Sequence, residues 1–165
     1  MIKVLVGNLF NSQAQTLVNA VNCVGVMEKG IALQFKIRFP EMYRDYVRRC
    51  EQQLVKLGEP YLFTQLFPPW VLNFPTKDHW RSRSKLDSIQ QGMDYMLQSY
   101  QTWGITSLAV PALGCGEGHL EWNQVGLILY GYLKQMNIPI ELYAPFGTPE
   151  SGLRLERKIV SDTIK

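Results

Sequence analysis

The apolar residues of the chain follow two periodicities that alternate along its length. Short apolar runs rich in β-branched and aromatic side chains are typical of buried strands. Each run is bounded by glycine, proline or polar residues. We therefore expect strands at residues 2–6, 17–21, 61–66, 71–74, 107–110 and 138–144.

Between these runs, apolar residues recur at three- and four-residue spacing, which is typical of a helix with one buried face. The longest such stretch runs from Leu86 to Tyr100 and ends near Gly104. Pro40 should interrupt the helical pattern that starts at Ile31 and begin the next helix, because proline is well tolerated in the first turn of a helix. The other helices are expected at 31–37, from Pro40 into a region closed by Gly58, and at 125–133.

Strands that alternate with helices predict an α/β sandwich in which a mixed sheet lies between helical layers. The length of 165 residues suits one domain. We expect residues 1–147 to form that domain. The more polar segment 148–165 should be a C-terminal tail, either a short helix or the beginning of a linker to a further domain.

Composition narrows the class of protein. The chain is 46% hydrophobic and 12% aromatic, which indicates a folded core. Its charge of +3 permits an anionic ligand but does not by itself indicate nucleic-acid binding. No apolar run approaches the ~18 residues of a membrane span, and no secretory signal is visible. Three cysteines without a CxxC motif favour a reducing cytoplasm over a disulfide framework.

Two glycine-rich loops follow predicted strands, at residues 22–32 and 111–120. Glycine lets backbone N–H groups approach an anion, and a helix that follows adds its positive end. Two such loops in one small domain indicate a diphosphate ligand. They can also be ordinary tight turns. A dinucleotide-binding Rossmann site fits poorly, because its G-x-G-x-x-G fingerprint should follow the first strand, which here leads into Gly7-Asn8-Leu9.

The residues of these segments resemble the macrodomain family, which binds ADP-ribose between two loops of a three-layer α/β/α sandwich. Residues 17–22 resemble the strand before its first loop, and residues 110–116 resemble its second loop. Three further strings, at 24–36, 73–81 and 120–122, resemble the DarG antitoxins, which are DNA ADP-ribosyl glycohydrolases. The string Asn-Phe-Pro-Thr-Lys-Asp-His-Trp-Arg at 73–81 is the most specific of these.

The resemblance implies an ADP-ribose site spread over both loops. Asn8 and Leu9 would lie near the adenine, whereas Asn19, Asn22 and Thr76 would meet the distal ribose. For the two asparagines, Asx-turn chemistry at a strand end is the alternative. The remaining expected ligand contacts are Ala20, Val21, Gly25, Val26, Met27, Lys29, Gly30, Ile31, Ala32, Pro111, Leu113, Gly114, Cys115, Gly116, Glu117 and Gly118.

The resemblance also implies that Lys77 is catalytic. A desolvated lysine can attack the ribose carbon of an N-glycosidic bond, or it can act as an acid toward the leaving base. The residues leave these two roles open. His79, Trp80 and Arg81 combine an imidazole, a stacking surface and a guanidinium, which suit an unstacked base and its phosphate. Without the resemblance, Lys77 would be interpreted as an ordinary charged residue of a solvent-exposed loop.

The expected activity is removal of ADP-ribose from a modified base in single-stranded DNA, and the resemblance implies that this base is thymidine. The expected partners are ADP-ribosylated single-stranded DNA and a cognate ADP-ribosyltransferase toxin. The alternatives are a non-catalytic ADP-ribose-binding module and a hydrolase of protein-linked ADP-ribose or O-acetyl-ADP-ribose. No cofactor is expected. No metal is expected either, because Cys115 and His119 do not form a zinc-ligand pattern.

Two positions depart from the families that the chain resembles. Glu28 stands where the related loop usually has glycine, so its carboxylate either weakens phosphate binding or turns outward. Gly118 stands where a related lysine-using glycohydrolase family has an acidic residue. Any second catalytic group must therefore come from elsewhere.

The substitution Glu28→Gly is predicted to tighten ADP-ribose binding, because it removes a negative charge beside the diphosphate and restores backbone freedom. Titration calorimetry of the two proteins with ADP-ribose measures the change. Equal affinities would contradict the prediction.

Overall fold

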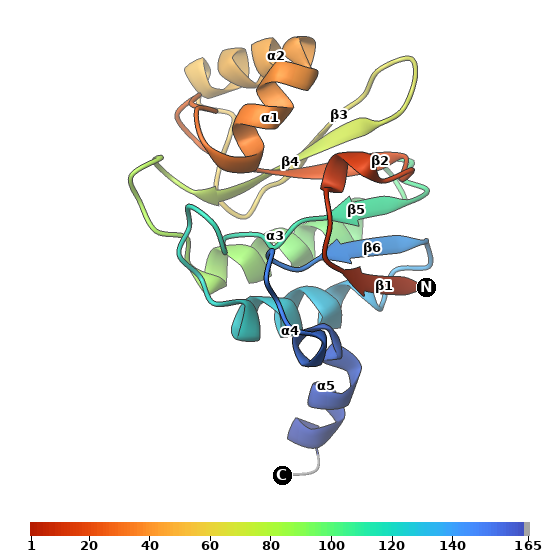
Figure 1. The fold of residues 1–165 in the computed structure, drawn as a ribbon. Coiled ribbons are helices and arrows are strands. Elements are labelled where there is room, and N and C mark those ends of the chain that lie inside the picture. Colours follow the sequence, from red (N-terminus) through yellow and green to blue (C-terminus); the bar gives the residue numbers. More distant parts are fainter. Residues whose placement is uncertain (164–165) are drawn as a thin grey trace.

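A computed structural model describes residues 1–163 and contains one six-stranded sheet (Figure 1). The strand order is β1-β6-β5-β2-β4-β3. All neighbouring strands are parallel except β3 and β4, so the predicted mixed sheet is confirmed. The strands are β1 (Ile2–Leu5), β2 (Thr16–Asn22), β3 (Tyr61–Phe63), β4 (Trp70–Lys77), β5 (Leu108–Val110) and β6 (Ile140–Tyr143).

Helices cover both faces of the sheet (Figure 1). On one face lie α1 (Gly30–Arg38) and α2 (Pro40–Glu51), and on the other lie α3 (Leu86–Ser99) and α4 (Trp122–Leu133). Strand β2 shows why two cores form, because alternate side chains point to opposite faces. Leu17 and Val21 pack with α1 and α2, whereas Val18 packs with α3 and α4.

Several predicted boundaries were wrong. The strand expected at 61–66 ends at Phe63, and the strand expected at 71–74 continues to Lys77. Asn73 is the last residue of β4 that pairs with β3. Pro75 lies beyond it, where β4 has only β2 as a neighbour, so a proline is tolerated there. The helix expected to reach Gly58 ends at Glu51, and Gln53 just beyond it has a left-handed φ of 57°.

The first part of the expected C-terminal tail packs against α4. It forms a short 3-10 helix, η2 (Glu150–Leu153), and helix α5 (Leu155–Thr163). The Trp122 indole donates to the Gly152 carbonyl at 3.1 Å, and Leu155 is buried. Of the two expected forms, the helical one is therefore present, at 150–153 and 155–163. That this segment begins a linker stays a prediction, and residues 164–165 lie outside the described residues.

None of the helices within residues 1–163 combines the length and apolar character that crossing a bilayer requires.

One close contact between α3 and the sheet generates a stability prediction. A Cβ on Gly92 would lie 2.2 Å from the Phe74 ring, so Gly92→Ala must displace a buried aromatic side chain. We expect a loss of about 1–3 kcal/mol in the free energy of unfolding, as for other overpacked cores, measured by urea denaturation.

Gly131 in α4 is the matched control, because a Cβ there meets nothing within 4 Å. Gly131→Ala should stabilise the protein by roughly 0.5–1 kcal/mol, since alanine loses less conformational freedom in a helix. If Gly92→Ala and Gly131→Ala changed the free energy of unfolding in the same direction, the close approach to the Phe74 ring would not be what limits packing at position 92.

Candidate functional site

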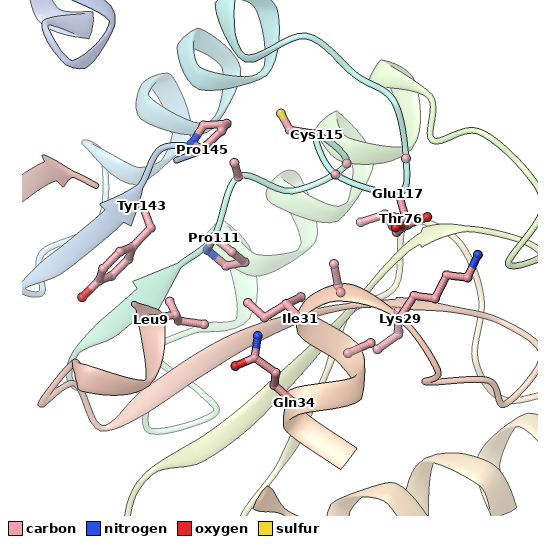
Figure 2. A pocket seen from close by; sticks show the side chains of 18 of the residues that line it. Leu9, Lys29, Ile31, Gln34, Thr76, Pro111, Cys115, Glu117, Tyr143 and Pro145 are labelled. Atoms are coloured by element: carbon pink, nitrogen blue, oxygen red, sulfur yellow. The ribbon is translucent and has the colours of Figure 1, made fainter. Parts of the chain in front are cut away.

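A pocket of about 720 Å³ lies at the carboxyl ends of the parallel strands (Figure 2). In open α/β sheets this edge is where ligands bind, because loops and helix N-termini gather there. Four loops and the end of β4 form its walls. The lining residues come from within five segments, although not every residue of each segment reaches the cavity: 7–10 after β1, 20–34 from β2 through its loop into α1, 76–80 at the end of β4, 111–118 after β5 and 143–146 at the end of β6.

The Asn22 side chain shapes the first loop from within. Its amide oxygen accepts from the Val24 N–H at 3.1 Å and from the Tyr46 hydroxyl at 2.8 Å, and its amide nitrogen donates to the Val26 carbonyl at 2.8 Å. Asn22 lines the pocket, but these bonds are the Asx-turn type considered above as the alternative to ligand contact. Its principal effect is to hold the loop open around Gly25, which has a φ of +84°.

Helix α1 begins directly at the pocket. Its N-cap residue Lys29 makes no side-chain capping bond, and Gly30, Ile31 and Ala32 of the first turn line the cavity. The N–H groups of a first helical turn have no acceptor inside the helix, and the helix dipole adds partial positive charge there. Together with the Lys29 ammonium group, this end of α1 suits an anionic ligand.

Glu28 in the same loop is paired with a neighbouring cation. Its carboxylate accepts from Lys36 Nζ at 2.6 Å, and this hydrogen bond is the main reason that the pKa of Lys36 is raised. The Lys36 ammonium group also lies 4.6 Å from the centroid of the Tyr43 ring. The negative charge of Glu28 is therefore compensated on the α1 side of the loop. The Glu28→Gly gain in affinity stays a prediction.

The glycines of the second loop have different roles. A Cβ on Gly114 would lie 2.7 Å from Leu120, and one on Gly118 would lie 2.3 Å from Ser84 Oγ. Both glycines therefore let the loop pack closely, Gly114 against Leu120 and Gly118 against Ser84. A Cβ on Gly116 would meet nothing within 4 Å, so this glycine leaves space for a ligand. The contact at Gly118 also explains why an acidic side chain is not accommodated there.

Lys77 bridges two segments at one end of the pocket. Its Nζ donates to the Trp80 carbonyl at 3.0 Å and to the Glu117 carbonyl at 3.1 Å. These bonds occupy two N–H groups, which leaves one position on the nitrogen for a ligand. Desolvation lowers the pKa of Lys77 from 10.5, and Lys29 acts in the same direction, whereas Glu117 opposes the shift.

A stacked group of side chains lies at the rim beside Lys77. Trp80 is 41% exposed and lines the pocket. The Arg81 guanidinium lies 4.5 Å from the centroid of the Trp80 ring, and the His79 ring centroid lies 5.1 Å from it. His79 and Arg81 do not line the pocket themselves, so they extend its edge as a cationic and aromatic surface.

The opposite end of the pocket is more apolar. Figure 2 shows Leu9 and Tyr143 at this end, away from Lys29, Thr76 and Glu117. The Asn8 side-chain oxygen accepts from the Phe10 N–H at 2.9 Å and caps the 3-10 helix η1 (Leu9–Asn11). The second lone pair of that oxygen and the amide NH₂ group are left for a ligand.

The pocket includes most, but not all, of the expected contact residues. Asn19, Met27 and Leu113 are fully buried instead, and Gly25 does not line the cavity either. Asn19 donates to Asn73 at 3.1 Å inside the core. The lining residues that were not anticipated as ligand contacts are Gly7, Phe10, Glu28, Gln34, Ala112, Tyr143, Ala144, Pro145 and Phe146.

One general rule could have predicted some of the lining residues that were not anticipated. Residues 143–146 end or follow the last predicted strand, and the carboxyl ends of parallel strands share one edge. No local signal distinguishes Gln34 from other polar residues of α1. Within the described residues there is no group of three or more His, Cys, Asp or Glu that could hold a metal ion.

A family model described as Macro domain matches residues 18–129. The chain therefore belongs to the Macro domain family, and the expected three-layer sandwich is confirmed. The DNA ADP-ribosyl glycohydrolase of Mycobacterium tuberculosis is 42% identical over 145 residues, which cover 86% of this chain and 41% of that protein.

Solved structures show the same relationship. The macrodomain of Mycobacterium tuberculosis DarG has a TM-score of 0.84 at 42% identity and covers 88% of this chain and 98% of that one. Thermosipho africanus DarTG in complex with ADP-ribose has a TM-score of 0.87 at 38% identity and covers 97% of this chain and 46% of that one. The chain spans less than half the length of the first curated relatives that it matches.

Proposed function

We propose that this protein is a DNA ADP-ribosyl glycohydrolase that removes ADP-ribose from a modified base, thymidine, in single-stranded DNA. The observation that carries the proposal is the partly desolvated Lys77, held by two backbone carbonyls where the pocket meets the exposed Trp80 ring. Similarity to proteins named DNA ADP-ribosyl glycohydrolase supports it.

The pocket suits ADP-ribose along its whole length. The apolar end at Leu9 and Tyr143 would take the adenine, and the uncapped first turn of α1 with the open space at Gly116 would take the diphosphate. The distal ribose would then lie near Thr76 and Lys77, the last two residues of β4. This order places the reacting carbon beside the lysine.

Breaking the bond between a ribose and a base leaves negative charge on the base nitrogen, which needs a proton. We assign this proton to the Lys77 ammonium group, whose lowered pKa makes it a better acid near neutral pH. The base outside the pocket would stack on Trp80, and Arg81 would meet the DNA phosphate. In this proposal the protein acts in the cytoplasm and reverses the DNA modification that a cognate ADP-ribosyltransferase toxin makes.

Lys77→Ala and Lys77→Arg are both predicted to slow release of ADP-ribose from single-stranded DNA carrying ADP-ribosylated thymidine by about 10²–10⁴-fold, the usual contribution of a general acid. Arginine keeps the positive charge but does not give up its proton at these pH values. Chromatography of released ADP-ribose measures the rate, and calorimetry should show that ADP-ribose still binds.

Lys134→Ala removes an exposed lysine at the end of α4 and is the matched control, which should behave like the wild type. Binding of ADP-ribose without release by the wild type would indicate a non-catalytic module. Release only from protein-linked ADP-ribose or from O-acetyl-ADP-ribose would indicate the third class of macrodomain.

The rate of release is predicted to fall on the alkaline side at a pH below 10.5, the ordinary pKa of lysine. The sign follows from the acid role, because Lys77 donates only while protonated and its pKa is lowered. A pH–rate profile with a pH-stable DNA substrate measures this. A rate that instead rises to a plateau over the same range, with a covalent adduct seen by mass spectrometry, would assign Lys77 as a nucleophile.

A further inference from the structure

The pocket contains two acidic side chains, and they are in different electrostatic situations. Glu28 is ion-paired with Lys36 at 2.6 Å. Glu117 forms no ion pair within 4.0 Å among the described residues, and its side chain is exposed to the pocket and to solvent. Glu117 is therefore the carboxylate of this site that is available to a water molecule or a substrate.

Glu117 lies at the same end of the pocket as Lys77. Its own carbonyl oxygen accepts from Lys77 Nζ at 3.1 Å, so the two residues are directly joined. Its Cγ lies 3.8 Å from the position that a Cβ on Gly30 would take, which places the side chain across the pocket from its loop, next to α1. Figure 2 shows Glu117 at the end of the pocket with Thr76 and Lys29, away from Leu9 and Tyr143.

The loop that carries Glu117 is tightly braced. The Leu120 N–H donates to the Gly114 carbonyl at 2.8 Å, and the Ser84 N–H donates to the Gly118 carbonyl at 3.1 Å. His119 has a left-handed φ of 62°, which turns the chain back toward α4. Since a Cβ on Gly118 would collide with Ser84, position 117 is where this turn can offer an acidic side chain to the pocket.

We propose that Glu117 is a second catalytic residue, the general base that activates water for cleavage of the N-glycosidic bond. The inference rests on the proposed function. The Glu117 carboxylate takes one proton from a water molecule while the water oxygen bonds to C1 of the distal ribose. The C1–N bond breaks, its electron pair stays on the base nitrogen, and the Lys77 ammonium group protonates that nitrogen.

The cycle closes when the protonated Glu117 carboxyl returns its proton to the neutral Lys77 amine, so water is the only reagent consumed. The charge of Glu117 works against the desolvation that lowers the pKa of Lys77, so it favours the protonated lysine that this step needs.

The test uses Glu117→Gln, which removes the base but keeps the size and polarity of the side chain. Release of ADP-ribose from single-stranded DNA carrying ADP-ribosylated thymidine should slow by about 10²–10⁴-fold, while ADP-ribose affinity by calorimetry is retained.

Two further variants make the result specific. Glu117→Asp keeps a carboxylate on a shorter chain and should restore part of the rate. Glu59→Gln removes an exposed carboxylate of a distant loop and should match the wild type in rate and pH profile.

The outcomes separate this inference from the proposed function. If the wild type releases ADP-ribose but Glu117→Gln releases it at the same rate, Glu117 is not the base and the proposed function stands. Loss of ADP-ribose binding in both Glu117 variants would give Glu117 a binding role instead and overturn the catalytic one. If the wild type releases nothing from the DNA, the proposed function itself is wrong.

Discussion

The parallel pairing of β2 with β4 is the constraint on which the site depends. The two strands lie side by side in the sheet, and their last matched residues are Asn22 and Lys77. The Cys23 N–H continues the ladder by donating to the Asp78 carbonyl at 3.0 Å. β2 therefore leads into the first loop, and β4 ends at Lys77 beside it. A shift of this register by one residue would turn Lys77 to the opposite face.

The walls of the pocket are held by bonds that need no ligand. Asn22 braces the first loop, Asn8 caps η1, and Lys77 ties the segment after β4 to the second loop. A site organised in this way loses little conformational freedom when a ligand binds. The same polar groups are therefore both structural supports and part of the lining.

Charge is distributed unevenly along the pocket. Lys36 compensates the negative charge of Glu28 in the first loop, and the uncapped α1 terminus with Lys29 supplies positive charge there. Lys77 and Glu117 remain at the far end, where the proposed chemistry needs an acid and a base. The net charge of +3 conceals this arrangement, because it sums groups from all faces of the molecule.

Local patterns in the sequence were enough to predict the α/β alternation and the two glycine loops, because periodicity and glycine placement are local properties. The string that contains Lys77 was singled out only by its resemblance to a known family. Tertiary structure decided which side chains reach the pocket. Asn19 and Asn22 belong to the same strand, yet Asn19 is buried beneath α1 and α2, whereas Asn22 reaches the cavity. Tertiary structure also decided that Glu28 pairs with Lys36 and that Glu117 lies in the pocket near Lys77. These features depend on strand register and on contacts between residues far apart in the chain, which no local pattern encodes.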